Sequence, residues 1–312
     1  MKEWSLYFQN EEFLAKSRFL IMNRDMRPMI ADWLGLRPGI KVLDVGCGTG
    51  EYTFYLGEAV EQADFTGVDL DGRFVEAAAG KAAALHTKNR FHFVQGDALH
   101  LPFEDDTFDL VVSQTFLVNI PDYMGALREM RRVCRTGGIV ASCTAAGLPP
   151  ISEAGEYPIY YRGWKSTYDR LYRKAWDMYE KLSPVSEWNA GVNPGKVQQA
   201  FVAAGLTDIT TYPVGGFFSL SNPTISDEEK RRYLELDYLA ETKKLRLWFE
   251  TVREARDYFT EAEVREFELA AEAKKGALTA AIGENRIWEW QAVTMLLILG
   301  KNPKETETAW VF

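Results

Sequence analysis

The chain has 312 residues, of which 46% are hydrophobic and 13% aromatic, and this is enough to bury a sizeable core. The composition excludes a disordered chain, a collagen-like fibre and a small disulfide-stabilised domain. The chain has 36 lysines and arginines and 45 aspartates and glutamates, which gives a formal net charge of -9. Because phosphate neutralisation provides most of the affinity for nucleic acids, this balance argues against nucleic acid as a partner.

Neither a disulfide framework nor a membrane anchor is expected. The three cysteines, Cys47, Cys134 and Cys143, fit no metal-binding spacing, so we expect no metal site and a reducing compartment. Residues 1–4 lead into polar sequence without the apolar region of a secretory signal, and the apolar run at 292–300 is too short to cross a bilayer. We therefore expect a cytoplasmic protein without membrane partners, either a monomer or a homodimer.

Short apolar runs alternate with helical patterns through the first half, which is typical of βαβ units around a parallel sheet. The expected strands are residues 41–45, 65–69, 91–95, 108–113, 139–144, 208–212 and 292–299. The expected helices are residues 11–34, 51–60, 72–86, 122–134 and a helix that begins at 193–194 and ends near 205.

Two segments interrupt this alternation. Residues 147–192 are rich in tyrosine and tryptophan, whereas residues 219–290 are charged and helical. Capping boxes at Ser226 and Thr260 predict helices over 227–258 and 261–282. The expected segments are a helical lid at 1–36, a cofactor-binding core at 37–146, an aromatic-rich lid at 147–192, a continuation of the core at 193–218, a helical insertion at 219–290, and a last core strand with a tail at 291–312.

The sequence Val-Leu-Asp-Val-Gly-Cys-Gly-Thr-Gly at residues 42–50 is the strongest functional signal. A buried strand leads there into a glycine-rich turn and the N-terminus of a helix, which favours anionic groups. Asp69 and Asp97 close the next two strands, and ligands of α/β sheets bind at the carboxyl ends of strands, so one nucleoside can reach all three loops. A dinucleotide fingerprint requires glycine at position 51, where this chain has Glu51.

The spacing G-x-G-x-G behind Asp44 resembles motif I of the class I S-adenosylmethionine-dependent methyltransferases. Residues 67–70 resemble motif II, residues 96–98 the adenine-side loop and residues 108–113 motif IV, so the resemblance covers about residues 40–145. It is greatest to the bacterial small-molecule type with helical insertions. It implies an α/β fold with a doubly wound, seven-stranded, mostly parallel Rossmann-like sheet and added helical lids, in which the last strand is antiparallel.

By this resemblance the cofactor is S-adenosyl-L-methionine and the product S-adenosyl-L-homocysteine. The implied cofactor-binding residues are Asp44, Gly46, Cys47, Gly48, Gly50, Asp69, Leu70, Gly96, Asp97, Ala98 and Gln114. Asp44 would hold the methionine amino end, Asp69 the ribose hydroxyls and Asp97 the adenine amino group. Leu70 would pack on the adenine, and Gln114 would lie near the methionine and sulfonium.

The residues that contact the acceptor are less clear from the pattern. Many small-molecule members have a histidine after strand four, where this chain has Asn119, so no general base is evident. Asn119 either orients a substrate or turns the chain before Pro121. The candidates for substrate contact are Tyr7, Asn119, Tyr160 and Trp164. An aromatic row at helical spacing from Tyr168 to Tyr179 is either core packing or an aromatic pocket.

We therefore expect an S-adenosylmethionine-dependent methyltransferase that acts on a small molecule, aromatic or amine-bearing. One alternative is an RNA or protein methyltransferase, which a basic patch at Arg128, Arg131, Arg132 and Arg135 would support. The other alternative is a module that binds S-adenosylmethionine without catalysis.

Overall fold

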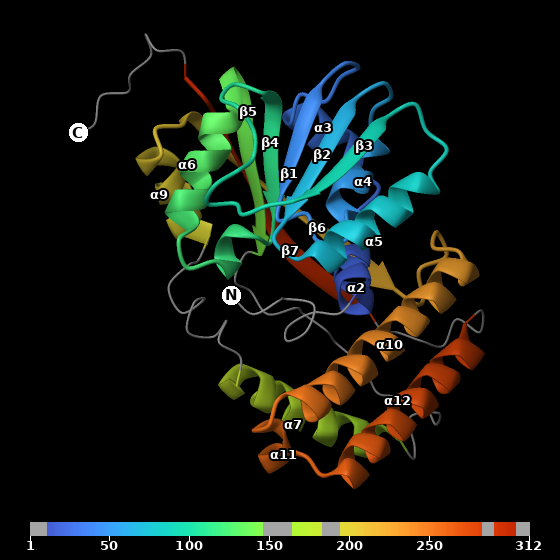
Figure 1. Ribbon diagram of the computed structural model, residues 1–312. Helices are drawn as coiled ribbons and strands as arrows, with labels where there is room; N and C mark the ends of the chain where they lie inside the picture. Colours follow the sequence, from blue (N-terminus) through green and yellow to red (C-terminus); the bar gives the residue numbers. More distant parts are fainter. Residues whose placement is uncertain (1–10, 146–163, 183–193, 283–289, 304–312) are drawn as a thin grey trace. The chain divides into compact units, whose positions relative to one another are not determined.

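The chain divides into two units, and the computed structural model describes residues 11–145, 164–182, 194–282 and 290–303 (Figure 1). The helical unit falls within Met1–Leu20, Pro150–Glu187 and Phe217–Val293. The sheet unit falls within Ile21–Pro149, Trp188–Gly216 and Thr294–Phe312. Within the described ranges, no helix combines the length and apolar character that a membrane crossing requires.

The sheet has seven strands in the described part of the chain, in the order β3-β2-β1-β4-β5-β7-β6. The strands are β1 (Lys41–Val45), β2 (Asp64–Asp69), β3 (Arg90–Gln95), β4 (Phe108–Gln114), β5 (Cys134–Ala145), β6 (Thr207–Ser219) and β7 (Trp290–Lys301). The pairs β1–β2, β2–β3, β1–β4 and β4–β5 are parallel, and β7 runs antiparallel to β5. The expected doubly wound, mostly parallel sheet is thus confirmed.

Helices cover both faces of this sheet (Figure 1). They are α3 (Arg27–Trp33), α4 (Glu51–Gly57), α5 (Gly72–Ala83), the short 3-10 helix η1 (Leu117–Asn119), α6 (Tyr123–Val133) and α9 (Pro194–Ala203). Met130 of α6 and Phe201 of α9 pack in one buried cluster with Val111 of β4. Because side chains alternate along a strand, Gln114 of β4 points to the opposite face, where α4 contributes Tyr52. The end of β4 therefore faces the helix that follows the glycine-rich turn.

The single helix expected over residues 11–34 is wrong, because the chain forms α2 (Glu11–Ile21) and α3 with a break between them. Pro28 lies in the first turn of α3. A proline within a continuous helix would clash with the preceding turn and leave a carbonyl without its donor, whereas the first turn tolerates it.

The helical unit contains α2, α7 (Lys165–Leu182), α10 (Asp227–Thr251), α11 (Ala255–Tyr258) and α12 (Glu261–Ala281). Ser226 and Thr260 both form the expected capping boxes, with Glu229 and Glu263 respectively. The helix expected over residues 227–258 is divided, because α10 ends at Thr251 and α11 begins at Ala255. The expected aromatic-rich lid lies largely outside the described residues.

The aromatic row of α7 packs in the core of the helical unit. Tyr168 stacks on Phe267 with ring centroids 5.4 Å apart, and Tyr179 meets Trp248 edge-on at 5.0 Å. The ammonium of Lys244 lies 4.1 Å from the centroid of the Tyr179 ring. These contacts are those that the core-packing alternative predicts, since the chain's own side chains cover the ring faces.

The buried ammonium of Lys244 predicts a pH-dependent stability. Burial lowers the pKa of Lys244 to about 8, although Glu241 opposes the shift. In the unfolded chain this lysine has a pKa of about 10.4. Above pH 8 the unfolded chain therefore binds more protons than the folded chain. Urea unfolding should therefore show stability rising from about pH 8 to 10. Lys244→Met should flatten this rise, whereas Lys243→Met, at the exposed neighbouring position, should leave it unchanged.

Candidate functional site

The turn between β1 and α4 depends on three glycines. Gly46, Gly48 and Gly50 have φ angles of 72°, 54° and 82°, a left-handed region that other residues rarely adopt. A Cβ atom on Gly46 would also overlap the ring of Phe116, which follows β4. The turn therefore requires glycine for its backbone conformation and packs closely against the end of β4.

A buried carboxylate lies at the end of β1 beneath this turn. The Asp44 side chain is 1% exposed, and its Oδ2 accepts a hydrogen bond of 2.7 Å from the hydroxyl of Thr53 on α4. Thr53 is equally buried. A hydrogen bond to a carboxylate both stabilises its charge and fixes its orientation. Thr53 thus holds Asp44 in one position beside the turn.

Asp69 ties the end of β2 to the glycine-rich turn. Its Oδ2 accepts from the amide of Gly48 at 2.9 Å, and its Oδ1 accepts from the amide of Asp71 at 3.0 Å. Burial raises the pKa of Asp69, and these backbone hydrogen bonds offset part of the shift. Each oxygen of an ionised carboxylate has a second lone pair, so both retain capacity for a ligand hydroxyl.

The loop after β3 lies next to Asp69. The amide of Gly96 donates to the carbonyl of Asp69 at 2.9 Å, and the Oδ1 of Asp97 accepts from the amide of Leu99 at 2.9 Å. Leu70, 40% exposed, presents an apolar side chain at the same strand ends. With Ala98 in the same loop, this edge offers the carboxylate and the apolar surface that a nucleoside requires.

The ends of β4 and β5 complete this edge of the sheet. Gln114 pairs in register with Cys143, and its side chain is buried. After Thr115, whose φ is 49°, the chain turns so that Phe116 reaches Gly46. The Nδ2 of Asn119 donates to the carbonyl of Thr115, which is the contact that the turn-forming alternative predicts.

The structure brings some of the candidate residues together and separates others. Asp44, Asp69, Asp97 and Gln114, together with the glycines, lie at the carboxyl ends of β1 to β4 in the sheet unit. Trp164 belongs to the helical unit, where it is buried with its ring centroid 6.0 Å from that of Tyr168. Tyr7 and Tyr160 lie outside the described residues.

Comparison with known proteins identifies the class. A family model described as a methyltransferase domain matches residues 42–138. The demethylmenaquinone methyltransferase of Staphylococcus aureus (strain JH9) is 36% identical over 180 residues, which make up 56% of this chain and 71% of that enzyme. The same figures hold for the enzyme of strain Newman.

This chain belongs to the class I S-adenosylmethionine-dependent methyltransferases.

Among solved structures, the methyltransferase is similar to Haemonchus contortus phosphoethanolamine N-methyltransferase 2 in complex with S-adenosyl-L-methionine. The TM-score is 0.48 at 14% identity, and the likeness covers 90% of this chain and 53% of that one, about half its length. The residues matched by the family model, 42–138, contain every cofactor-site residue named from the sequence, from Asp44 to Gln114.

Two residues of the candidate site were not predicted from sequence. Phe116 covers Gly46, and Thr53 orients Asp44. Thr53 lies in the first turn of α4, on the face toward β1. The helical period could have predicted this position. The contact of Phe116 with Gly46 had no such signal, because it depends on the left-handed conformation of Thr115.

Proposed function

We propose that this methyltransferase transfers the methyl group of S-adenosylmethionine to a small, uncharged aromatic acceptor. The assignment of the cofactor site is supported by the position of Asp44, Asp69 and Asp97, which lie together at the carboxyl ends of three neighbouring parallel strands. When bound, the cofactor supplies an electrophilic methyl group on a sulfonium. Asp44 holds the methionine amino end, Asp69 the ribose hydroxyls, and Asp97 with Ala98 the adenine.

The residues present fit this cofactor. The left-handed glycines at 46, 48 and 50 shape the tight turn at the carboxyl end of β1, and Leu70 supplies an exposed apolar surface for a planar base. Phe116 and Gln114 lie on the methionine side of the glycine-rich turn, at the end of β4. By aligning the acceptor with the methyl group, such a site provides much of the rate acceleration without a dedicated base.

Two observations support an aromatic, uncharged acceptor. The Staphylococcus enzyme named above acts on demethylmenaquinone, a small-molecule quinone. In addition, the hollow at the end of β4, into which Gln114 faces, is lined by apolar residues and tyrosines such as Val214, Leu297 and Tyr52. An uncharged acceptor places no unpaired charge against this lining.

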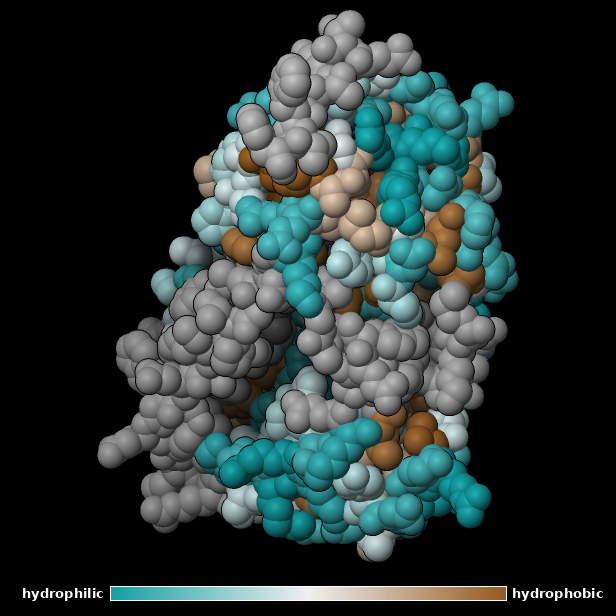
Figure 2. Space-filling model, turned by 90° about the vertical axis from the view of Figure 1, so that its left-hand side faces the viewer, coloured by the Kyte–Doolittle hydropathy of each residue, from teal (hydrophilic) through white to brown (hydrophobic). Residues whose placement is uncertain are grey.

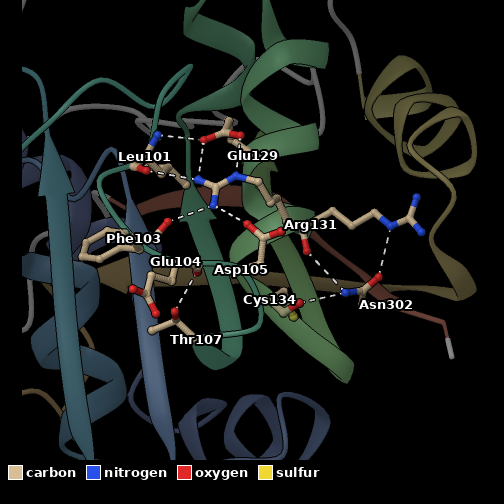
Figure 3. Close-up of polar contacts among 10 residues, drawn as sticks. Leu101, Phe103, Glu104, Asp105, Thr107, Glu129, Arg131, Cys134 and Asn302 are labelled. Atoms are coloured by element: carbon tan, nitrogen blue, oxygen red, sulfur yellow. Dashed lines mark hydrogen bonds and ion pairs between the residues drawn. The ribbon is translucent and has the colours of Figure 1, made fainter. Parts of the chain in front are cut away.

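The basic patch that would support nucleic acid methylation is largely engaged within the chain (Figure 3). Arg132 binds Glu129 and Asp105, and Arg131 donates to the Oδ1 of Asn302 at 3.0 Å. Arg135 forms an ion pair with Asp109 at 2.7 Å.

This patch also lies far along the sheet from the cofactor loops. Asp105 precedes β4, so the patch surrounds the amino ends of β4 and β5, and the loops follow the carboxyl ends. Figure 2 shows one face of the molecule, on which hydrophobic residues lie in small groups between hydrophilic ones. These findings favour a small molecule over a nucleic acid as the acceptor.

Calorimetric titration with S-adenosylmethionine and S-adenosylhomocysteine, with NAD as control, tests the cofactor assignment. We expect saturation at one site per chain by the first two ligands and none by NAD. Methyl transfer from a radiolabelled cofactor to neutral hydroxylated aromatics, amines and RNA then tests the acceptor class. Labelling of RNA or of amines alone would contradict the proposal.

Thr53→Val should weaken binding of S-adenosylmethionine about tenfold, because it removes a hydrogen bond to a carboxylate and frees Asp44 to rotate. Thr53→Ser keeps the hydroxyl and should restore most of the affinity. Calorimetry measures both variants. Equal affinities of the valine and serine variants would show that the hydroxyl does not position Asp44.

A further inference from the structure

A small hollow lies at the carboxyl ends of β4 and β5 in the sheet unit. Gln114 and Cys143, which are neighbours in the register, form one side of it, and Tyr52 of α4 another. Its volume is about 10 Å³, room for one water molecule or one hydroxyl group. Because Phe116, two residues after Gln114, contacts Gly46, the hollow lies at the same edge of the sheet as the glycine-rich turn.

Gln114 brings to this hollow a hydrogen-bond acceptor that nothing in the described part of the chain satisfies. The side chain is 4% exposed, and its Oε1 has no donor among the described residues. Such a buried oxygen costs about 1–3 kcal/mol if it stays unsatisfied. The hydroxyl of Tyr55, which also lines the hollow, is already bound to the carbonyl of Asn23 at 2.7 Å.

The lining defines which donor fits. None of the described lining residues is charged, and the apolar ones are Ile21, Met22, Ile30, Val214 and Leu297. Burial raises the pKa of Tyr52 well above its usual range, so this phenol also stays neutral. A hydroxyl group on an apolar body can donate to this Oε1 without bringing a charge into the apolar lining.

We propose that Gln114 determines acceptor specificity: its Oε1 accepts a hydrogen bond from a hydroxyl group of the methyl acceptor. The site thereby selects hydroxylated aromatic molecules over the same molecules without the hydroxyl group. This inference rests on the proposed function, because it requires the cofactor to occupy the neighbouring glycine-rich turn. A site built to receive a hydroxyl discriminates strongly against the analogue that lacks it.

Fluorescence titrations with 2-naphthol and naphthalene, in the presence of saturating S-adenosylhomocysteine, test the proposal. The wild-type protein should bind 2-naphthol about tenfold more tightly than naphthalene, because one buried hydrogen bond accounts for a difference in affinity of that size. Gln114→Met, similar in volume but without the amide, should abolish this preference. The control Gln198→Met, at an exposed position of α9, should keep the preference.

Two results would overturn the proposal. If Gln114→Met keeps the preference for 2-naphthol, a structural water satisfies the amide. If the variant instead loses affinity for S-adenosylhomocysteine and keeps the preference, Gln114 serves the methionine end alone. Failure of the wild-type protein to bind S-adenosylmethionine would be a different outcome, since it contradicts the proposed function itself.

Discussion

Asp69→Ala is expected to lower the affinity for S-adenosylmethionine on the order of a hundredfold, because two ribose hydroxyls lose a charged hydrogen-bond acceptor. The amide of Gly48 also loses its partner, so the glycine-rich turn becomes less ordered before binding. Since burial raises the pKa of Asp69, wild-type affinity should begin to fall at a higher pH than an ordinary aspartate would give. Calorimetry at several pH values measures both effects.

Asp64→Ala provides the matched control on the same strand. Asp64 begins β2 and pairs with the exposed Arg90, at the end of the strand away from the cofactor loops. Its removal should change the affinity less than twofold, since exposed ion pairs contribute little. Unchanged affinity in Asp69→Ala, with the thermal transition also unchanged, would exclude Asp69 from the cofactor site.

The parallel core could be predicted closely from sequence, because its strands are short, apolar and bounded by turn residues. β1 was predicted at its observed bounds, and β2, β3 and β4 to within one residue. β5 begins five residues earlier than expected, at Cys134. Its first residues include Arg135 and Gly137, polar and glycine positions that lack the hydrophobic pattern of a strand.

The edge that holds the proposed cofactor site could be predicted from sequence for a different reason. Asp44 and Asp69 lie in the last residues of β1 and β2, and Asp97 follows β3, so strand prediction alone brings their carboxylates to one edge. Contacts across that edge were not visible. The contact between Phe116 and Gly46 joins residues far apart in the chain, and no periodicity encodes it.

The helical unit shows the same limit, since the sequence of residues 219–290 indicates charged helices but not which charges are buried together. Lys16 of α2 lies 2.5 Å from Asp237 of α10 and 2.8 Å from Glu241, and Lys274 of α12 lies 2.8 Å from Asp237. All four side chains are at most 15% exposed. These buried ion pairs join three helices that are distant in sequence.

Asp237→Ala should therefore destabilise the protein by about 3–5 kcal/mol, because two ammonium groups would stay buried without their shared partner. Although burial alone would raise the pKa of Asp237, Lys16 and Lys274 hold it well below its usual range. A carboxylate whose pKa is lowered by folding stabilises the folded state at pH values above its pKa in the unfolded chain, which is about 4. This contribution to the free energy of unfolding is lost as the pH falls. Wild-type stability should thus decline from about pH 5 downward more steeply than that of the variant.

Glu235→Ala, two residues earlier on α10, separates this effect from the mere loss of a carboxylate. Glu235 is exposed and pairs with Lys275 at 3.0 Å, so its removal should cost at most about 1 kcal/mol. Urea unfolding followed by circular dichroism measures both variants between pH 3 and 7. Equal losses in Asp237→Ala and Glu235→Ala would mean that water reaches the cluster, because only a desolvated ion pair makes the two sites differ.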